Sequence, residues 1–554
     1  MKLRGKIAAL LAVTLVLGSS MFPLPARAQG GQAPVITMEV DVPPVIRRPV
    51  PFPVAVTVMN KGEENQDVVL KEVRLKAAGG QEKLLHRQEL NQPLKAVGRE
   101  LRTLDQEKER AGQGDRSAAP ERLEQLAGQV NRGKKAIKIT VDPNTLVDHF
   151  APGKKLHLKL EADLLPADSV TPDKANQKAV KVMALTREKT ITVAPPLERP
   201  PVPPGASHSD WYFGDTHSHS TYTWDYWIGN GIYTIPELKS LAMAAGLDWL
   251  NLTDHSYCLD AGKYQEIKNQ TTALCDPQFS FLYGEELSVR EIKDGTTSDL
   301  DTAHYATILN ETFVPSVTNI FRQAYSPNSQ EGIDRTKNSG GLVVINHPQW
   351  GDRPLEPWNF NLKTYPWTHG ENAIELINGP WDDPDLGAVT RWIEQRLLKG
   401  EKVAAVGASD TESQNRLGTA MTVTYAGNNT RQDIKTSLAG GKQYATTGPG
   451  LALWARPEGD FTWHWMGETV TAGTGRQVEI YVAKAWSTGS LDIKVMKGRA
   501  GAPSEETVDT RTLPAGSDSY TITVTVDPGT YIRAWAVDPA NSGARAYTTP
   551  VWFN

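Results

Sequence analysis

Between residues 211 and 410, short apolar runs repeatedly end beside side chains that can bind a metal ion. The runs are typical of buried strands, and helix-like segments separate several of them. In parallel β/α barrels, the residues at the carboxyl ends of the strands converge on one site. The recurrence therefore predicts a β/α barrel with one metal-binding site. The residues concerned are His217, His219, Asp254, His255, Glu286, His304, His347 and Asp410.

The first of these runs, Trp211–Asp215, leads into His217 and His219. Residues two apart in an extended chain point to the same side, so both imidazoles can reach one ion. A lone His-x-His pair is also compatible with a surface turn, and the prediction therefore depends on the motifs that follow.

The N-terminal 28 residues are typical of a secretory signal peptide. They begin with a basic segment, continue with the apolar run Ile7–Leu17, and end in Ala26-Arg-Ala28, which fits a cleavage site before Gln29. We therefore expect an exported protein, either periplasmic or extracellular. Gln29, not a cysteine, stands directly after the cleavage site, so we expect no lipid anchor there. No later segment is apolar for long enough to span a bilayer, so we expect no transmembrane anchor.

Charge and cysteine content limit the expected partners. Without the signal peptide the chain keeps 55 basic and 64 acidic residues, a net charge of −9, which disfavours nucleic acid as a partner. A small molecule is the expected partner. Cys258 and Cys275 are the two cysteines, and in an exported protein they can pair or remain as thiols.

At 554 residues the chain is too long for one domain. We expect a β-rich, immunoglobulin-like domain over residues 29–194, with a charged insertion at 82–132 that is helical or partly disordered. A proline-rich linker follows at 195–207, since prolines favour an extended chain. The predicted barrel domain covers 208–450, and a second β-sandwich covers 451–554. Four tryptophans of this last domain could line a carbohydrate surface, although core packing is the preferred interpretation: Trp454, Trp463, Trp465 and Trp535.

Inside the predicted barrel, Thr234-Ile-Pro-Glu237 has the pattern of a capping box with proline in the first turn. Apolar residues at helical spacing follow it, and Gly246 is placed to end the helix. The sequence therefore predicts a helix between Thr234 and Gly246.

The ordered motifs resemble those of the PHP superfamily, the polymerase and histidinol phosphatase metallohydrolases, and most closely its CehA/McbA-type branch. They are His217-Ser-His219, Thr253-Asp-His255, Gly284-Glu-Glu286, His304, Asn346-His347-Pro348 and Ser409-Asp410, with Asp225 six residues after His219. The resemblance covers residues 208–554. It implies a distorted, seven-stranded parallel β/α barrel that binds two or three divalent metal ions.

The resemblance also implies a ligand set. His217, His219, Glu286 and Asp410 would hold one ion, and Glu286 would bridge to a second ion held by His304 and His347. Asp225 and His255 would belong to a third site. Most relatives have Asp-x-His at the last motif, whereas Glu412 follows Asp410 here. A carboxylate at that position favours harder ions and makes occupation of the third site an open question.

Imidazoles and carboxylates without a thiolate suit Zn, Mn or Fe. Two such ions generate a bridging hydroxide near neutral pH and stabilise negative charge on the attacked oxygen. We therefore expect a metal-dependent hydrolase in which Asp254 orients a ligand or a water molecule. The resemblance implies phosphoester hydrolysis, and Arg416 and Arg353 are candidates to contact a phosphate.

Two alternative functions are also compatible with these residues. Tryptophans flank the ligand motifs, and an aromatic wall would suit carbamates or aryl esters, an activity known in the CehA/McbA-type branch; these are Trp224, Trp227, Trp350 and Trp381. A different class of function is a non-catalytic envelope or carbohydrate-binding protein with a degenerate metal site, which the unusual Glu412 would favour.

Overall fold

The computed structural model describes residues 35–554, apart from residues 63–65, 79–81, 113–119, 150, 168–182, 206–209, 226–228, 294–295, 317–327, 349–367 and 380–383. The predicted signal peptide lies outside the described residues, as do Arg353, Trp227, Trp350, Trp381 and the side chains of Trp224 and Asp225. Among the described helices, none is long and apolar enough to cross a membrane.

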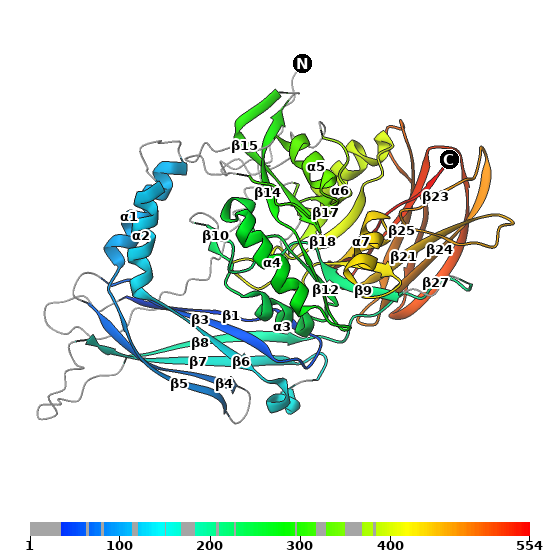
Figure 1. Cartoon of the computed structure of the whole chain (residues 1–554). Helices are drawn as coiled ribbons and strands as arrows, with labels where there is room; N and C mark the ends of the chain where they lie inside the picture. The colour runs from blue at the N-terminus through cyan, green and yellow to red at the C-terminus, as the bar shows by residue number, and fades with distance from the viewer. Residues whose placement is uncertain are drawn as a thin grey trace, which may run out of the picture.

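The N-terminal part of the chain forms two β-sheets that lie beneath the rest of the molecule in Figure 1. One sheet has the order β1-β3-β6, with β1 Ile36–Asp41, β3 Phe52–Asn60 and β6 Lys134–Val141. The other has the order β2-β8-β7-β4-β5, with β2 Val45–Ile46, β8 Met183–Val193, β7 Lys155–Pro166, β4 Val68–Ala78 and β5 Lys83–Leu94. Alternate residues of β3, from Phe52 to Val58, are fully buried, because alternate side chains of a strand face the core.

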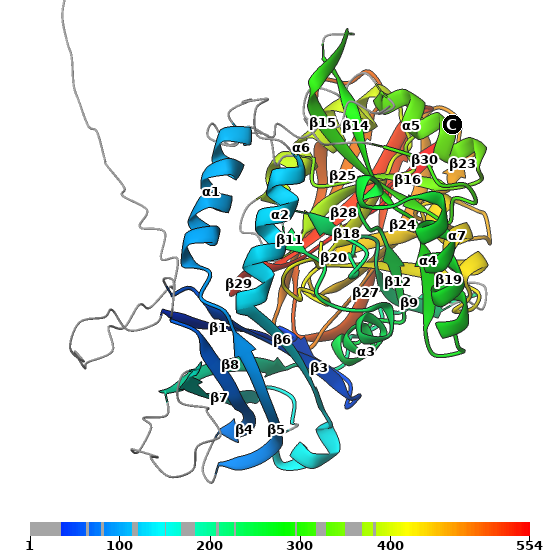
Figure 2. The ribbon, with the colours of Figure 1, turned by 60° about the vertical axis from the view of Figure 1, so that its left-hand side comes forward.

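The first part of the charged segment 82–132 is a strand, whereas the sequence predicted a helical or partly disordered insertion. Lys83–Leu94 is the edge strand β5, which pairs with β4 and keeps its charged side chains on the exposed side. Two helices then follow, α1 (Gly98–Gly112) and α2 (Pro120–Val130), and they lie side by side in Figure 2. Leu104, Leu123 and Val130 form a small apolar cluster of their own. Two short 3-10 helices flank β6, Asn131–Gly133 and Pro143–His149.

The central part combines parallel and antiparallel strands. In the first sheet β12 (Trp249–Leu252) is parallel to β9 (Asp210–Asp215) and to β13 (Ser280–Tyr283), while β19 (Met421–Ala426) is antiparallel to β9. The second sheet has the order β14-β15-β16-β17-β18: β14 Glu286–Lys293, β15 Thr296–Ile308, β16 Leu342–Ile345, β17 Ala373–Asn378 and β18 Ala404–Ala408. A short hairpin, β10 (Trp224–Asp225) with β11 (Gly229–Asn230), stands apart.

These described strands depart from the expected barrel of seven parallel strands, because not all of them are parallel. Strand β15 returns directly from β14 and is antiparallel to both β14 and β16, and β19 is also antiparallel to its neighbours. Two single-residue bridges join the two sheets near the carboxyl ends of β9 and β12, Ser218 to Thr411 and His255 to Glu286. The strand ends therefore converge, although the strands are hydrogen-bonded as two mixed sheets and are not all parallel.

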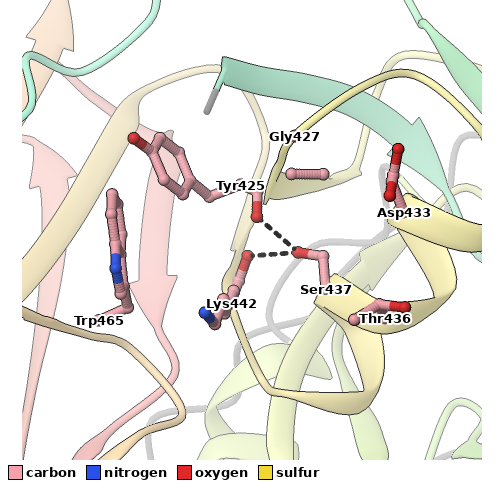
Figure 3. A pocket seen from close by; sticks show the side chains of 8 residues that line it. Tyr425, Gly427, Asp433, Thr436, Ser437, Lys442 and Trp465 are labelled. Carbon is pink, nitrogen blue, oxygen red and sulfur yellow. Dashed lines mark hydrogen bonds between the residues drawn. The ribbon is translucent and has the colours of Figure 1, made fainter. Parts of the chain in front are cut away.

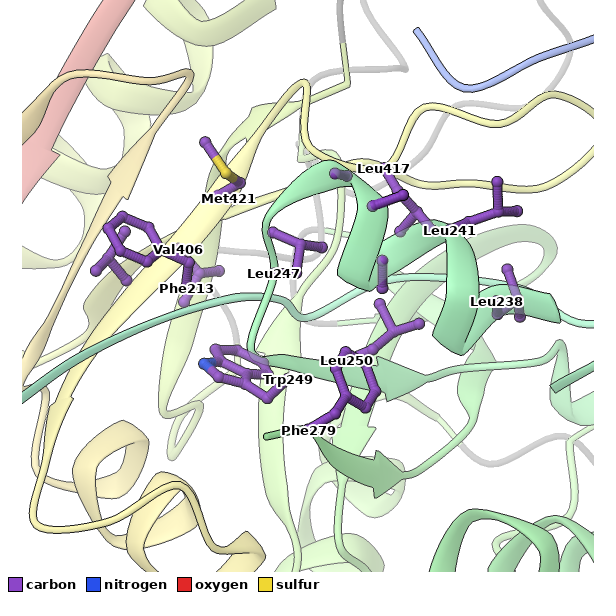
Figure 4. Packing of buried hydrophobic residues seen from close by; sticks show 14 of the residues in the cluster. Phe213, Leu238, Leu241, Leu247, Trp249, Leu250, Phe279, Val406, Leu417 and Met421 are labelled. Carbon is purple, nitrogen blue, oxygen red and sulfur yellow. The ribbon is translucent and has the colours of Figure 1, made fainter. Parts of the chain in front are cut away.

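Helices cover the outer faces of these sheets: α3 Ile235–Ala245, α4 Ala261–Leu274, α5 Ser329–Asn338, α6 Pro384–Gln395 and α7 Arg431–Ala439, with 3-10 turns at Ser256–Cys258 and Leu397–Lys399. Helix α3 confirms the predicted capping box, which Thr234 and Glu237 form, and Gly246 ends the helix with φ of 94°. Figure 4 shows how Leu238 and Leu241 of α3 pack towards Leu250, beside Trp249 and Phe213.

The C-terminal part contains a four-stranded sheet of β22 His464–Trp465, β21 Gly450–Pro457, β24 Arg476–Trp486 and β27 Gly516–Val526. Its other strands are β23 Thr469–Val470, β25 Leu491–Arg499, β26 Glu506–Leu513, β28 Thr530–Asp538, β29 Asn541–Thr548 and β30 Val551–Phe553. They continue the central sheet, because β20 (Gln443–Thr446) pairs with β29. Trp454 and Trp465 are 0% and 7% exposed, which confirms core packing for these two tryptophans.

Candidate metal centre

One buried carboxylate, Glu286, lies at the centre of five imidazoles. Its oxygens are 2.7 to 3.6 Å from a ring nitrogen of each, and Glu286 itself is 1% exposed. The five rings belong to His217, His219, His255, His304 and His347. The structure thus brings together all five histidines that the sequence singled out.

Each of these side chains belongs to a residue that either lies within a strand or follows the end of one. His217 and His219 follow β9, and His255 follows β12. Glu286 begins β14, while His304 lies in β15 opposite Ser288 of that strand. The antiparallel hairpin therefore places His304 and Glu286 on neighbouring strands.

Two candidate ligands have backbones in the left-handed region. The φ angles are 25° for His347, which follows β16, and 51° for Asp410, which follows β18. Residues other than glycine rarely adopt positive φ, and such strain is concentrated at functional sites. Hydrogen bonds stabilise both strained conformations here. His347 N donates to Glu375 Oε2 at 2.6 Å, and Asp410 N donates to the His217 carbonyl at 3.1 Å.

The side chains form four overlapping groups of three, and within each group the ligand atoms lie within 4.8 Å of one another. The groups are His217, His219 and Asp410; His217, Glu286 and His347; His219, His255 and Glu412; and His255, Glu286 and His304. The arrangement therefore suggests the binding of divalent metal. Asp225 can be assigned to none of them, as its side chain is outside the described residues.

The tautomers of the first two rings follow from their partners. His217 Nδ1 lies 2.8 Å from Glu375 Oε1, and because a carboxylate only accepts, this nitrogen carries the proton. His219 Nδ1 lies 3.1 Å from Thr223 Oγ1, whose single proton is donated to Asp254. His219 Nδ1 is therefore also a donor.

In the neutral rings, the Nε2 atoms of His217 and His219 consequently present lone pairs to each other at 3.1 Å. Asp410 Oδ1 is 3.4 and 3.5 Å from the same two atoms. Lone pairs and a carboxylate oxygen that converge in a buried space repel one another unless a proton or a cation lies between them. The donor set thus fits a metal ion.

The electrostatics of the cluster agree with this donor set. Burial alone would raise the pKa of Glu286, but His304, His217 and His255 hold that pKa well below its ordinary value. Burial would lower the pKa of His217, yet the charges of Asp410, Glu286 and Glu375 raise it well above normal. The carboxylates of the site therefore favour positive charge at its centre.

Sequence reasoning missed Glu375, which lies inside β17 and supports two candidate ligands. Its Oε1 accepts from His217 Nδ1, and its Oε2 accepts from His347 N and from Asn378 Nδ2. Such partners fix the tautomer and the orientation of a ligating imidazole. A glutamate within the apolar strand Ala373–Asn378 gives no signal of this in the sequence, where it is compatible with a solvent-facing position.

Asp254, which the sequence indicated as an orienting residue, faces the turn after His219. Its carboxylate accepts from Ser220 N, Ser220 Oγ, Thr223 N and Thr223 Oγ1, at 2.7 to 3.0 Å. The hydroxyl of Thr223 links it to His219, since this hydroxyl donates to Asp254 and lies 3.1 Å from His219 Nδ1. Within the described contacts, Asp254 therefore shapes the turn and the tautomer of His219.

Arg416 lies beside the cluster. Its Nη1 is 3.5 Å from the Asp410 carbonyl, so the guanidinium contacts the backbone of a candidate ligand. Glu412 Oε1 is 3.3 Å from His255 Nε2, and the ring of Tyr257 is stacked on that imidazole at 4.8 Å. The Glu412 carboxylate is thus placed to bind an ion together with His255.

The cysteines take no part in the cluster. No disulfide joins Cys258 to Cys275, so the possible pairing is not formed. Cys275 Sγ instead donates to the Thr271 carbonyl and accepts from Phe281 N.

A pocket lies apart from the candidate ligands, between α7, β19 and β22 (Figure 3). It has a volume of about 150 Å³. The rings of Tyr425 and Trp465 are stacked on one another at 3.8 Å, and Ser437 Oγ is bonded to the carbonyls of Tyr425 and Lys442. Its polar and aromatic groups thus already contact each other, and no candidate ligand lines it.

No protein-family model matches the chain, and no curated protein matches it. A two-domain protein from Bacteroides vulgatus containing a "predicted PHP-like metal-dependent phosphoesterase" is 14% identical over 65% of this chain and 100% of that one, with a TM-score of 0.33. A candidate metal-dependent phosphoesterase from Bifidobacterium adolescentis is 14% identical over 39% and 92% of the two chains, with a TM-score of 0.27. Both scores are below 0.5, so the function must be inferred from the geometry of the site.

Proposed function

We propose that this protein is a PHP-like metal-dependent hydrolase whose centre is built around Glu286. The observation that carries the proposal is the convergence of five imidazole nitrogens within 3.6 Å of that one carboxylate. Buried charges occur in proteins when they are paired or coordinate metals, and this carboxylate has only histidines and Asn346 as its side-chain partners among the described contacts.

The residues present would hold two or three divalent ions, and Zn, Mn or Fe suit their nitrogen and oxygen donors. When bound, such ions lower the pKa of water and stabilise negative charge on an attacked oxygen. The side chains around the candidate ligands hold those ligands in place. Glu375 and Thr223 fix the rings of His217 and His219, and Asn346 Nδ2 donates to Glu286 Oε1 at 2.9 Å.

For the substrate we propose a phosphoester. Phosphoryl oxygens are ligands of such ions, and Arg416 lies next to Asp410, where its guanidinium could turn towards a bound phosphate. The second candidate is a carbamate or an aryl ester, as in CehA/McbA-type hydrolases. The observation that favours it is the half-buried Tyr257 ring stacked on His255, which offers an aromatic surface beside the candidate ligands.

The test begins with chain purified in metal-free buffer, whose Zn, Mn and Fe contents are determined by elemental analysis. The metal-loaded protein is then assayed on nitrophenyl phosphate mono- and diesters and on naphthyl carbamates. We expect bound metal and turnover of the phosphoesters. Turnover of the carbamates alone would favour the carbamate or aryl ester as the substrate. Absence of bound metal would contradict the proposal of a metal-dependent hydrolase and would favour a binding protein.

We also propose that the chain is exported, on the basis of its N-terminal sequence. N-terminal sequencing of protein from the cell envelope and the medium is expected to begin at Gln29. Intact protein retained in the cytoplasm would contradict export.

A further inference from the structure

The segment from Ser409 to Thr419, here called the Asp410 loop, carries two candidate ligands without the support of a helix or a strand longer than one residue. Asp410 and Glu412 lie near its beginning. Its own side chains hold it in part, since Thr411 Oγ1 accepts from Arg416 N and Asn415 Oδ1 accepts from Leu417 N, each at 3.0 Å. The strained backbone of Asp410 therefore depends on contacts made by the rest of the loop.

One such contact comes from the N-terminal domain. Asp41, the last residue of β1, accepts the backbone N–H of Asn415 with both carboxylate oxygens, at 3.2 and 3.0 Å. Its Oδ2 also accepts from the hydroxyl of Tyr233 at 2.6 Å. A residue 374 positions away in sequence thus fixes the backbone in the middle of the loop.

A second contact lies near the end of the loop. Arg47 Nη1 donates to the carbonyls of Gly418 and Ala245, at 3.2 and 3.0 Å. Gly418 has φ of 80°, and a Cβ there would lie 2.9 Å from Ala245 Cβ and 3.2 Å from Val45 Cγ1. The N-terminal domain thus contacts the end of the loop, and a larger residue at 418 would press against Ala245 of α3 and against Val45 and Arg47 of that domain.

A short path connects these contacts with the metal centre. Asp41 holds Asn415 N, and the next residue, Arg416, donates its backbone N–H to Thr411 Oγ1. The Thr411 carbonyl accepts from His219 N at 2.8 Å, and Thr411 itself lies between Asp410 and Glu412. Displacement of Asn415 would therefore be transmitted to three candidate ligands through contiguous hydrogen bonds.

We propose that the N-terminal domain is a positioning element of the metal centre and that Asp41 is its positioning residue. The carboxylate holds the Asp410 loop in the conformation in which Asp410 and Glu412 face the imidazoles. This inference rests on the metal binding of the proposed function, but it does not depend on which substrate is hydrolysed. It assigns a role to a domain that the sequence alone left without one.

The test compares the full chain with Asp41→Ala, Asp41→Asn and Lys138→Ala. Lys138 is the control, because it pairs with Glu237 across the same two domains without touching the Asp410 loop. Affinities for Mn²⁺ and Zn²⁺ are measured by titration calorimetry, and hydrogen exchange of residues 409–419 is followed in metal-free protein. Circular dichroism verifies that each variant is folded.

For Asp41→Ala we expect at least about 10-fold weaker binding of one ion, the range for residues that support metal ligands, together with faster exchange in the Asp410 loop. Asp41→Asn keeps an oxygen that accepts from Asn415 N, so its affinity should stay within about 3-fold of the wild type. Lys138→Ala should alter neither readout.

Unchanged affinity and exchange in Asp41→Ala would overturn this inference, and so would an equal loss in Lys138→Ala. Bound metal without any hydrolysis would overturn only the proposed function. A wild-type chain that binds neither Mn²⁺ nor Zn²⁺ would overturn both.

Discussion

At the scale of single residues, two adjacent glutamates show how surroundings decide the role of a carboxyl group. Glu286 lies among the five imidazoles. Glu285 points elsewhere, and its Oε1 accepts from Asn310 Nδ2 and Val314 N at 2.9 and 2.8 Å. Burial raises the pKa of Glu285 to about 8, so this carboxyl is largely neutral at pH 7.

We expect Glu286→Gln to weaken metal binding by more than about 100-fold, beyond the range for residues that touch only a ligand, because the charge at the centre is lost. Elemental analysis and titration calorimetry measure this loss. Glu285→Gln is the matched control and should keep the wild-type metal content, since a neutral side chain already occupies that position. Equal metal contents in the two variants would contradict the central position of Glu286.

Glu375 provides a second prediction at this scale. Glu375→Gln should weaken metal binding by about 10-fold, because the amide supports the tautomer of His217 less well than a carboxylate does. The affinity for Mn²⁺ or Zn²⁺ measures the effect, with Glu394→Gln on the exposed surface of α6 as the control. If the two variants bind equally well, Glu375 has no supporting role.

These residues also show what the sequence can and cannot predict about a site. The histidines were identified because most of them end an apolar run, where strand ends converge. Glu375 lies within such a run, and its role arises only from contacts with His217 and His347, 158 and 28 positions away. Contacts of this kind depend on how the strands are arranged, which a single sequence does not specify.

At the scale of elements, local sequence signals predict helix ends more accurately than they predict pairings between strands. The capping box and Gly246 gave both ends of helix α3, because the backbone groups concerned lie within a few residues of each other. In contrast, the charged residues of β5 suggested a helix or disorder, and only pairing with β4 makes this segment a strand. The antiparallel course of β15 was likewise hidden, as its direction is set by its partners β14 and β16.

A network of partly buried ion pairs on β4 and β7 yields a prediction about pH. Arg74 of β4 forms ion pairs with Glu72, Glu161 and Asp163, and the nearby Lys76 also pairs with Glu161. In the folded state Arg87 and, to a smaller extent, Arg74 lower the pKa of Glu72, whereas Lys76 and Lys159 lower the pKa of Glu161. A lowered pKa contributes stability above the unfolded value of 4.5, and this contribution is lost as the pH falls through the folded value.

We therefore expect Arg74→Met to lower the free energy of unfolding at pH 7, because the variant loses the charge-assisted hydrogen bonds to Glu72, Glu161 and Asp163. The difference from the wild type should shrink as the pH is lowered towards 3, where the carboxylates are protonated in both proteins. Calorimetric unfolding at several pH values measures this difference. A loss of equal size at pH 7 and at low pH would indicate that Arg74 stabilises the sheet by packing alone.

At the scale of the whole molecule, hydrogen bonding does not stop at the expected boundary between residues 450 and 451. Strand β20 pairs with β29, and Thr549 Oγ1 accepts from Ala405 N of β18 at 3.1 Å. The last residues of the chain thus support strands that lead to the metal centre. Near the other end of the chain, Asp41 and Arg47 contact the Asp410 loop, which connects β18 to β19.

This continuity predicts that a chain ending at Gly450 will not form a stable metal centre. Truncation would remove the partner of β20 and leave an open strand edge, which favours aggregation. We expect the truncated chain to be insoluble or to bind at least about 10-fold less metal, by analogy with the loss of supporting contacts. Co-expression of residues 451–554 as a separate polypeptide should restore solubility and metal content, because β29 can then pair with β20 again. A soluble truncated chain with the full metal content would show that the central sheet is independent of its C-terminal extension.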